Sequence, residues 1–368
     1  MKVQSEKRLR TLVAATAVLT VTVIGPVGSP AQDKPVGSVP PAKQKAPLQV
    51  SAFFDFEKPL DLIFTTNLRQ LRGDRGTVPP WRVATLGYTG ADGKPVVVPL
   101  RVRTRGIWRL KNCNFPPLRL NFAAVNTKGT IFEGLDKPKL TSYCQDNSRY
   151  EEYVLQELQL YRVYRLLTPI SHSARLTRVT YTDSATGREA TTRSAFIMEE
   201  LSVVAARAGG TGLETNGAQS GDLDPYHDAL MGVFEYFIGN TDFSIGGLHN
   251  AELVQHADGR VFPVAYDFDF SGAVNARYAT VDPSLNFDRV RDRLFRGFCV
   301  DVAEFRKVFA LFNEKKAAIY GLYEDEVGAR LPRRVASETL KYFDEFYRTI
   351  NDPRAAKREI TDACRRRA

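Results

Sequence analysis

The chain has 368 residues, of which 43% are hydrophobic and 25% are charged, and this is enough for one large domain or two smaller ones with cores of their own. The main body shows no repeats and no low-complexity stretches, which excludes a repeat protein and a largely disordered chain. The formal net charge of +9 indicates a basic surface or a preference for anionic ligands such as phosphates. It does not indicate nucleic-acid binding, because the basic tail at Arg365–Arg367 is short.

The N-terminus has the pattern of a secretory signal peptide. A basic start precedes an apolar run from Thr11 to Val27, and Ser29 and Ala31 stand at the −3 and −1 positions of a cleavage site after Ala31. Cleavage removes a net charge of +3 and leaves +6 on the mature chain. We therefore expect a signal peptide at residues 1–31 and an exported protein, periplasmic or extracellular, that starts with a flexible leader at 32–50. No later segment is long and apolar enough for membrane insertion.

Residues 51–205 are expected to form a strand-rich lobe with one helix. Short apolar segments alternate with turn residues throughout this range. Several strands are expected within Phe53–Phe122, where Ala91–Gly93 forms a hairpin turn. A further strand is expected at Pro138–Tyr143, and two paired strands are expected on either side of a turn at Ser184–Gly187. The helix is expected from Ser148 to Leu167, where steps of three and four residues place Glu157 on the same face as Tyr153 and Tyr161.

Residues 206–352 are expected to form a helical lobe that also contains a β-hairpin. A Gly-rich loop at Gly209–Gly221 connects the two halves, and a helix begins at the cap Asp224 with Pro225 in its first position. The chain is mostly helical from Val300, and residues 353–368 form a basic tail. The predicted fold class is therefore α+β.

Four cysteines in an exported chain predict disulfides, because an oxidising compartment permits them. Three full pairings are possible. Cys113 with Cys144 is the expected pair, since both flank predicted strands of the N-terminal half. No CxxC or CxxH spacing indicates a zinc site.

Two charged residues in the N-terminal half indicate phosphate chemistry. Lys139 lies in a short predicted strand, and Glu157 lies on the inner face of the next helix. A strand lysine and a helix glutamate form the ion pair that positions nucleotide phosphates in kinases. Because both residue types are common, this pair alone is a weak signal.

Three polar residues follow in the order of the parts of a phosphoryl-transfer site. Asp242 lies in a loop, Asn250 leads into a strand, and Asp267 ends the hairpin that follows. In such sites the first Asp accepts the substrate hydroxyl proton, and the Asn and the last Asp hold the metal on the phosphates. Strand alternation through AYDFDFSG places Asp267 and Asp269 on one face, so we expect both to bind Mg²⁺ or Mn²⁺.

The two aspartate motifs, GNTDFSIGGLHNAEL and PVAYDFDFSG, resemble the catalytic hairpin of the CotH kinase family (spore coat protein H) and of the related HipA-like kinases. RTRG…PPLRLNF resembles the RG…RLKF stretch of the CotH family, the helix Ser148–Leu167 resembles its next helix, and AFIMEE resembles its strand ending in glutamate. The resemblance covers about residues 100–275. It implies a divergent protein-kinase-like bilobal fold that uses ATP and a divalent metal, with Asp242 as catalytic base and Asn250 and Asp267 as metal ligands.

The chain departs from that family in two places. The paired lysines before RLKF are Pro116 and Pro117 here, so the phosphate-binding role is assigned to Lys139. Because no GxGxxG loop is present, we expect Arg105 and Gly106 to cover the phosphates instead. The complete set of expected nucleotide-binding residues is Lys139, Glu157, Arg105, Arg119 and Glu199. His249, beside Asn250, is an alternative metal ligand.

The resulting hypothesis is an exported CotH-like atypical kinase that transfers the γ-phosphate of ATP to a Ser or Thr hydroxyl of an unknown protein substrate. One alternative is an exported pseudokinase that acts as a surface binding or structural protein, which the missing glycine loop and lysine pair favour. Another is a metal-dependent phosphoesterase, which also uses clustered carboxylates.

Overall fold

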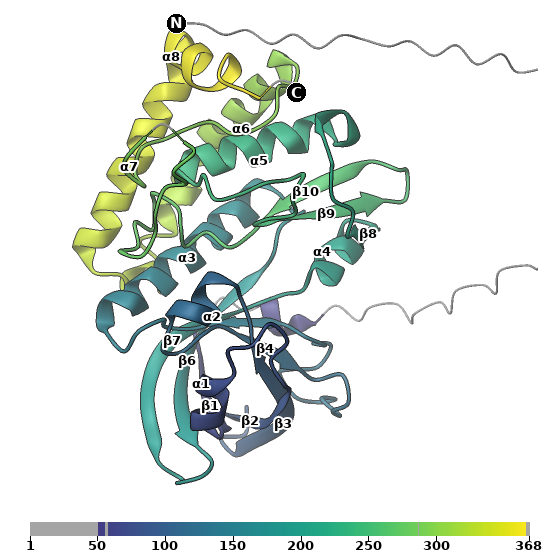
Figure 1. Ribbon diagram of the computed structural model, residues 1–368, viewed down its shortest axis with the longest axis vertical. Helices are drawn as coiled ribbons and strands as arrows, with labels where there is room; N and C mark the ends of the chain where they lie inside the picture. Colours follow the sequence, from purple (N-terminus) through teal and green to yellow (C-terminus); the bar gives the residue numbers. More distant parts are fainter. Residues whose placement is uncertain (1–50, 56–57, 286, 366–368) are drawn as a thin grey trace, which may run out of the picture. The chain divides into compact units, whose positions relative to one another are not determined.

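The computed structural model describes residues 51–55, 58–285 and 287–365, which lie in one compact unit. The expected signal peptide and leader, residues 1–50, lie outside the described residues. The described chain combines helices and strands, which confirms the α+β class (Figure 1).

The strand-rich part is a closed barrel with the strand order β1-β2-β3-β4-β5-β7-β6. Its neighbouring strands pair antiparallel except β1 and β6, which pair parallel. Alternate residues such as Phe64, Leu86 and Leu120 point into the barrel and fill it. The strands are β1 (Leu60–Thr66), β2 (Arg82–Thr89), β3 (Pro95–Thr104), β4 (Leu118–Asn121), β5 (Lys139–Thr141), β6 (Ala174–Asp183) and β7 (Glu189–Met198).

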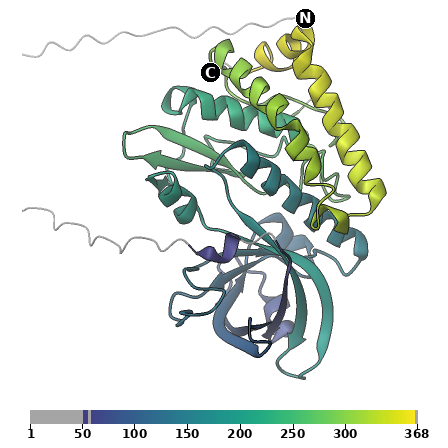
Figure 2. The same cartoon turned by 180° about the vertical axis from the view of Figure 1, so that it is seen from behind.

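A second, larger core lies among the long helices, which Figure 2 shows from behind. The predicted helix α3 (Ser148–Leu167) packs here with α5 (Pro225–Ile238), α6 (Val302–Gly321) and α7 (Arg333–Asn351), although its sequence lies in the strand-rich half. Its aromatic face, including Tyr161 and Tyr164, contacts Phe234 and Phe268. The shorter helices are α1 (Leu68–Gly73), α2 (Trp108–Asn112), α4 (Leu201–Arg207) and α8 (Pro353–Ala356).

A three-stranded sheet carries the hairpin that precedes Asp267. Its strand order is β10-β9-β8, with β8 (Gly210–Leu213), β9 (Ala251–His256) and β10 (Val261–Ala265). The preceding helix α5 has Asp224 at its N-cap and Pro225 in its first turn, as expected. It ends at Gly239, whose φ of 66° and close approach to the Tyr342 hydroxyl leave no space for a side chain.

The strand predicted through AYDFDFSG is shorter than expected. β10 ends at Ala265, and Asp267 has a left-handed backbone with φ of 64°. The alternation that placed Asp267 and Asp269 on one strand face is therefore wrong, because the chain turns directly after Tyr266. The two carboxylates nevertheless come together, as described below.

Two disulfides stabilise the described chain. Cys113 and Cys144 form the expected bond, and Cys299 bonds to Cys364 near the C-terminus. The predicted basic tail is thus partly structured, with α8 and a short π-helix at Lys357–Thr361 before Cys364. None of the described helices combines the length and apolar composition that a membrane span requires.

Asp228 on α5 provides a test of the helical core. Its carboxylate is buried, and burial raises its pKa to about 6, although Ser220 Oγ donates a hydrogen bond of 2.9 Å and Arg365 attracts it. The folded state holds the proton more tightly than the unfolded chain, so stability falls as pH rises from about 4 to about 6.

We expect Asp228→Asn to be more stable than the wild type by about 1–3 kcal/mol near pH 8 in urea unfolding. This difference should disappear near pH 4, and equal stability at both pH values would show that the bond from Ser220 offsets the burial.

Candidate functional site

Three carboxylates meet where α3 faces the segment after β10. The carboxylate oxygens of Glu157, Asp267 and Asp269 lie within 4.8 Å of one another. Glu157 and Asp269 are buried, whereas the Asp267 side chain is 34% exposed. Asp267 is therefore the member that a ligand from solvent can reach.

Arg109 on α2 holds two of these carboxylates. Its Nη2 donates to Glu157 Oε2 at 2.6 Å and its Nε donates to Asp269 Oδ2 at 2.8 Å, while Asp267 Oδ1 lies 4.0 Å from Nη2. Figure 1 shows α2 beside α3, at the end of the barrel. A guanidinium group can donate hydrogen bonds to two carboxylates at the same time. Arg109 therefore connects α2 to both α3 and the segment after β10.

The acidic cluster carries more negative charge than Arg109 neutralises. Burial raises the pKa of Glu157 and of Asp269 above the usual carboxyl range, although Arg109 opposes this shift. Three carboxylates and one guanidinium would leave a charge of about −2 if all were ionised. A divalent cation beside Asp267 would offset this excess, and carboxylate oxygens are the ligands that Mg²⁺ and Mn²⁺ prefer.

Asn250 links the acidic cluster to the loop of Asp242. Its carbonyl accepts the N–H of Tyr266 at 3.2 Å, one residue before Asp267. Its side-chain Nδ2 donates to the carbonyl of Asp242 at 2.6 Å and to Asp242 Oδ2 at 3.1 Å. The structure thus brings the three expected residues Asp242, Asn250 and Asp267 into one site, with Asn250 in the middle.

Asp242 is also held from its other side. His249 Nε2 lies 2.9 Å from Asp242 Oδ1, and the N–H of Asp242 donates to Asn240 Oδ1 at 3.0 Å. The Asp242 side chain remains 40% exposed. Its carboxylate is therefore fixed in orientation and still accessible to an incoming hydroxyl group.

The backbone is strained at this site. Four non-glycine residues in the described chain have positive φ, and three of them, Leu248, Asn250 and Asp267, belong to the two motifs. Such conformations cost free energy and persist where the surrounding structure imposes them, often at functional sites.

Several cationic side chains lie close together on strands β3, β4 and β5 of the barrel. Arg103 pairs with Arg119 and Arg119 with Lys139 across β3, β4 and β5, so the three side chains share one face of the sheet. Arg105 follows β3 directly. Burial lowers the pKa of Lys139 and of Arg119, and the charge of Arg105 lowers both further. An anion bound here would relieve this repulsion.

The ring of Tyr266, the residue directly before Asp267, contacts a cation of the barrel. Lys139 Nζ lies 4.3 Å from the ring centroid. Burial, together with the charges of Glu252 and Asp267, raises the pKa of Tyr266 to about 12, and the charges of Arg105 and Arg119 oppose this shift. Asp267 and the cations of the barrel therefore act on the same hydroxyl.

The expected ion pair between Lys139 and Glu157 is wrong. Lys139 Nζ instead contacts Glu252 Oε1 on β9 at 3.2 Å, and Glu252 Oε2 contacts His172 Nε2 at 2.8 Å. Although burial acts in the opposite direction, Lys139 and His172 hold the pKa of Glu252 well below its usual range. The side chain of Lys139 reaches across to the hairpin, whereas Glu157 faces α2, so the two residues have separate partners.

Glu199 is held by other groups. Its carboxylate contacts Arg207 Nη2 at 2.6 Å and accepts the N–H of Ser173 at 2.7 Å, which indicates a structural role. The charges of the neighbouring Glu200 and of Glu252 act on Arg119 instead.

Sequence reasoning missed Arg109, Glu252 and His172. Arg109 stands in the segment GIWRL, and a charged residue between Trp108 and Leu110 is the same kind of signal that singled out the aspartates of AYDFDFSG. Glu252 and His172 carried no comparable signal, because their partners are distant in sequence.

No protein-family model matches the chain, and a search of curated proteins finds no match either. The function must therefore be argued from the residues of the site.

Proposed function

We propose that the protein is an exported atypical kinase of the CotH type, which transfers the γ-phosphate of ATP to a Ser or Thr hydroxyl of a protein. The observation that carries this proposal is that Tyr266, whose ring contacts Lys139 of β5, directly precedes the accessible carboxylate of Asp267. A nucleotide polyphosphate with its divalent ion needs both kinds of group in one place.

The residues of the site fit a divalent ion at Asp267. Asp267 and the side-chain oxygen of Asn250 would hold it, since Asn250 uses its Nδ2 for both bonds to Asp242. Such an ion would neutralise charge on the phosphates during transfer. Asp269 and Glu157 are engaged by Arg109, so we assign them the role of orienting the segment that carries Asp267 rather than that of direct ligands.

The cations of the barrel would bind the phosphates of ATP. Lys139, Arg119 and Arg105 lie on or directly after neighbouring strands, and this spacing suits an extended chain of anionic groups. In this role they take the place of a glycine-rich loop, which the sequence lacks.

Asp242 would act as the catalytic base. It accepts the proton of the acceptor hydroxyl as the oxygen attacks the γ-phosphorus and the bond to the leaving ADP breaks. The contacts from His249 and Asn250 hold its carboxylate in position, which reduces the cost of orientation.

The fold supports this proposal in part. A helix that carries Glu157 next to the acidic cluster, and a hairpin followed by Asp267, are elements that a kinase-like bilobal fold would need. The closed barrel is a departure, because a kinase N-lobe is built on an open sheet. The two disulfides are consistent with export to an oxidising compartment.

One observation favours the pseudokinase alternative. Arg109 already occupies two of the three carboxylates of the cluster, and a permanent cation can replace a metal in a site that has lost its chemistry. In that case the protein would bind a partner or a nucleotide without transferring phosphate.

A phosphate-transfer assay tests the proposal. The purified chain is incubated with γ-labelled ATP, Mg²⁺ or Mn²⁺ and serine-containing proteins, and label in protein is measured. We expect transfer by the wild type and a loss of at least about 100-fold in Asp242→Asn, because a general base contributes that much. Asp242→Asn should still bind ATP.

The matched control is Asp258→Asn, in the turn between β9 and β10, where the carboxylate contacts Arg260 instead of the site. It should transfer phosphate as the wild type does. Wild-type protein that binds ATP with metal and transfers nothing would support the pseudokinase, and full activity in Asp242→Asn would remove Asp242 from the mechanism.

A further inference from the structure

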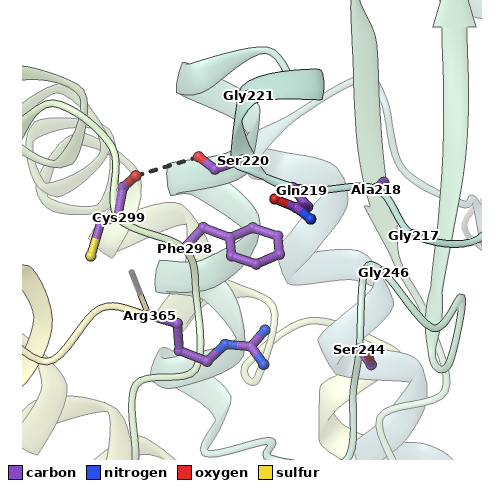
Figure 3. Close-up of a pocket in the computed structure, with 10 residues that line it drawn as sticks. All are labelled: Gly217, Ala218, Gln219, Ser220, Gly221, Ser244, Gly246, Phe298, Cys299 and Arg365. Atoms are coloured by element: carbon purple, nitrogen blue, oxygen red, sulfur yellow. Dashed lines mark hydrogen bonds between the residues drawn. The ribbon is translucent and has the colours of Figure 1, made fainter. Parts of the chain in front are cut away.

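A cavity of about 870 Å³ lies beside the loop that carries Asp242 (Figure 3). Ser244 and Gly246 of that loop form part of its wall, next to the segment 217–221. The two segments are joined by a hydrogen bond from the N–H of Gly217 to the carbonyl of Gly246 at 2.7 Å. A group bound in this cavity would therefore contact the loop that carries the proposed base.

Arg365 is the charged side chain that lines the cavity. Figure 3 shows Arg365, Phe298 and Gln219 gathered around the same space. Its guanidinium lies 5.1 Å from the ring of Phe298, and its Nε is buried with no hydrogen-bond acceptor among the residues that the structure describes. A carboxylate on a ligand in the cavity would pair with the guanidinium, because Arg365 is part of the cavity wall.

Arg365 is affected by one neighbouring cation and one neighbouring carboxylate. Burial lowers the pKa of its guanidinium, the nearby charge of Arg296 lowers it further, and Asp228 opposes them. Asp228 is turned toward Ser220, whose Oγ donates to Asp228 Oδ2 at 2.9 Å. Among the described residues, none that lines the cavity has a carboxylate, so their side chains are complementary to a negatively charged ligand.

The backbone of Arg365 is fixed by the second disulfide. Cys364 bonds to Cys299, the N–H of Arg365 donates to the carbonyl of Gly297 at 2.9 Å, and the N–H of Cys299 donates to the carbonyl of Arg365 at 3.1 Å. The guanidinium is thus presented from a rigid segment, which lowers the entropic cost of binding.

We propose that this cavity is the acceptor subsite and that it binds an acidic segment of the substrate protein through Arg365. The proposal rests on the proposed kinase function and adds the class of acceptor, a serine or threonine with glutamate or aspartate nearby. Glycines on both walls leave main-chain groups accessible to an extended peptide.

Peptide binding tests this inference without ATP or metal. Fluorescein-labelled serine peptides with flanking glutamates, glutamines or lysines are titrated with the full chain, and anisotropy is measured. We expect the glutamate peptide to bind most tightly and Arg365→Glu to weaken it at least about 30-fold, as for loss of one partner of a buried charge pair. Arg365→Lys should retain part of the affinity.

Two further variants make the result specific. Arg354→Glu on α8 makes the same charge change at an exposed position outside the cavity and should leave binding unchanged. Ala218→Trp fills the cavity without altering charge and should weaken binding as Arg365→Glu does. The subsite proposal would be overturned if Arg354→Glu weakened peptide binding as much as Arg365→Glu does. It would also be overturned if Arg365→Glu and Ala218→Trp both bound the peptide as tightly as the wild type.

The two proposals can fail separately. Binding of the glutamate peptide through Arg365 without any transfer of phosphate would support the subsite and refute the kinase. Transfer of phosphate with the same KM for the glutamate peptide in the wild type and in Arg365→Glu would refute the subsite and leave the kinase in place.

Discussion

Asp267→Asn is expected to weaken metal-dependent binding of ATP by at least about 100-fold, since even outer-shell partners of a metal contribute 10–100-fold. Asp267 has the most exposed carboxylate of the acidic cluster, and it is the one that Arg109 holds least closely, at 4.0 Å. An asparagine retains the shape and one oxygen but removes the charge that attracts a divalent ion. Calorimetry with ATP, with and without Mg²⁺ or Mn²⁺, measures the change.

The backbone at this position makes asparagine a suitable replacement. Asp267 has a φ of 64°, and asparagine tolerates this conformation better than most residues do. The bond from its N–H to the hydroxyl of Tyr161 at 2.8 Å does not depend on the side chain. A folded variant is therefore expected, and unchanged metal-dependent binding would show that the metal is held elsewhere.

Asp258→Asn is the control for this measurement as well, because it removes an equal charge at the tip of the hairpin. It should bind ATP with metal as the wild type does. A folded wild type that binds no ATP under any condition would contradict both the kinase and a nucleotide-binding pseudokinase, and the acidic cluster would then have a structural role.

Arg109→Met is expected to destabilise the protein by about 3–5 kcal/mol, because it leaves buried carboxylates without their cation. The Arg109 side chain is 10% exposed and bridges Glu157 on α3 and Asp269 after β10. Methionine keeps much of the aliphatic volume, so the change reports mainly on the charge. Urea unfolding with EDTA present, which excludes metal ions, measures the effect.

A compensated variant separates the charge from the packing. Arg109→Met combined with Glu157→Gln and Asp269→Asn removes the three charges together and should recover part of the stability. Arg82→Met is the control, because its pair with Asp74 is more exposed to solvent and should contribute much less to stability. An effect of Arg109→Met no larger than that of Arg82→Met would show that the buried carboxylates are neutralised in another way.

Local patterns predicted the secondary structure well. The helix expected from Ser148 to Leu167 has these bounds, and α5 begins at the predicted cap Asp224. Both depend on periodicity and capping, which act within a few residues of the chain. The prediction failed where the chain left a strand, because the turn after Tyr266 depends on contacts with Asn250 and Tyr161 rather than on its own residues.

The sequence predicted which residues belong to the site better than it predicted which ion pairs they form. Asp242, Asn250 and Asp267 lie together, because a short loop and one hairpin connect them in sequence. The partner of Glu157 was assigned wrongly as Lys139. An ion pair depends on which side chains the packed elements bring face to face, and Arg109 reaches Glu157 only because α2 lies against α3.

The sequence by itself determined the α+β class, the main helices and the order of the polar motifs, since each depends on local spacing, whereas it left three cysteine pairings open. Only the tertiary structure decided that Arg109 occupies the acidic cluster, that Lys139 contacts Glu252, and that Arg365 lines a cavity beside the loop of Asp242. These are contacts between segments far apart in the chain. Charge and burial select their partners only after the barrel and the helical core have packed.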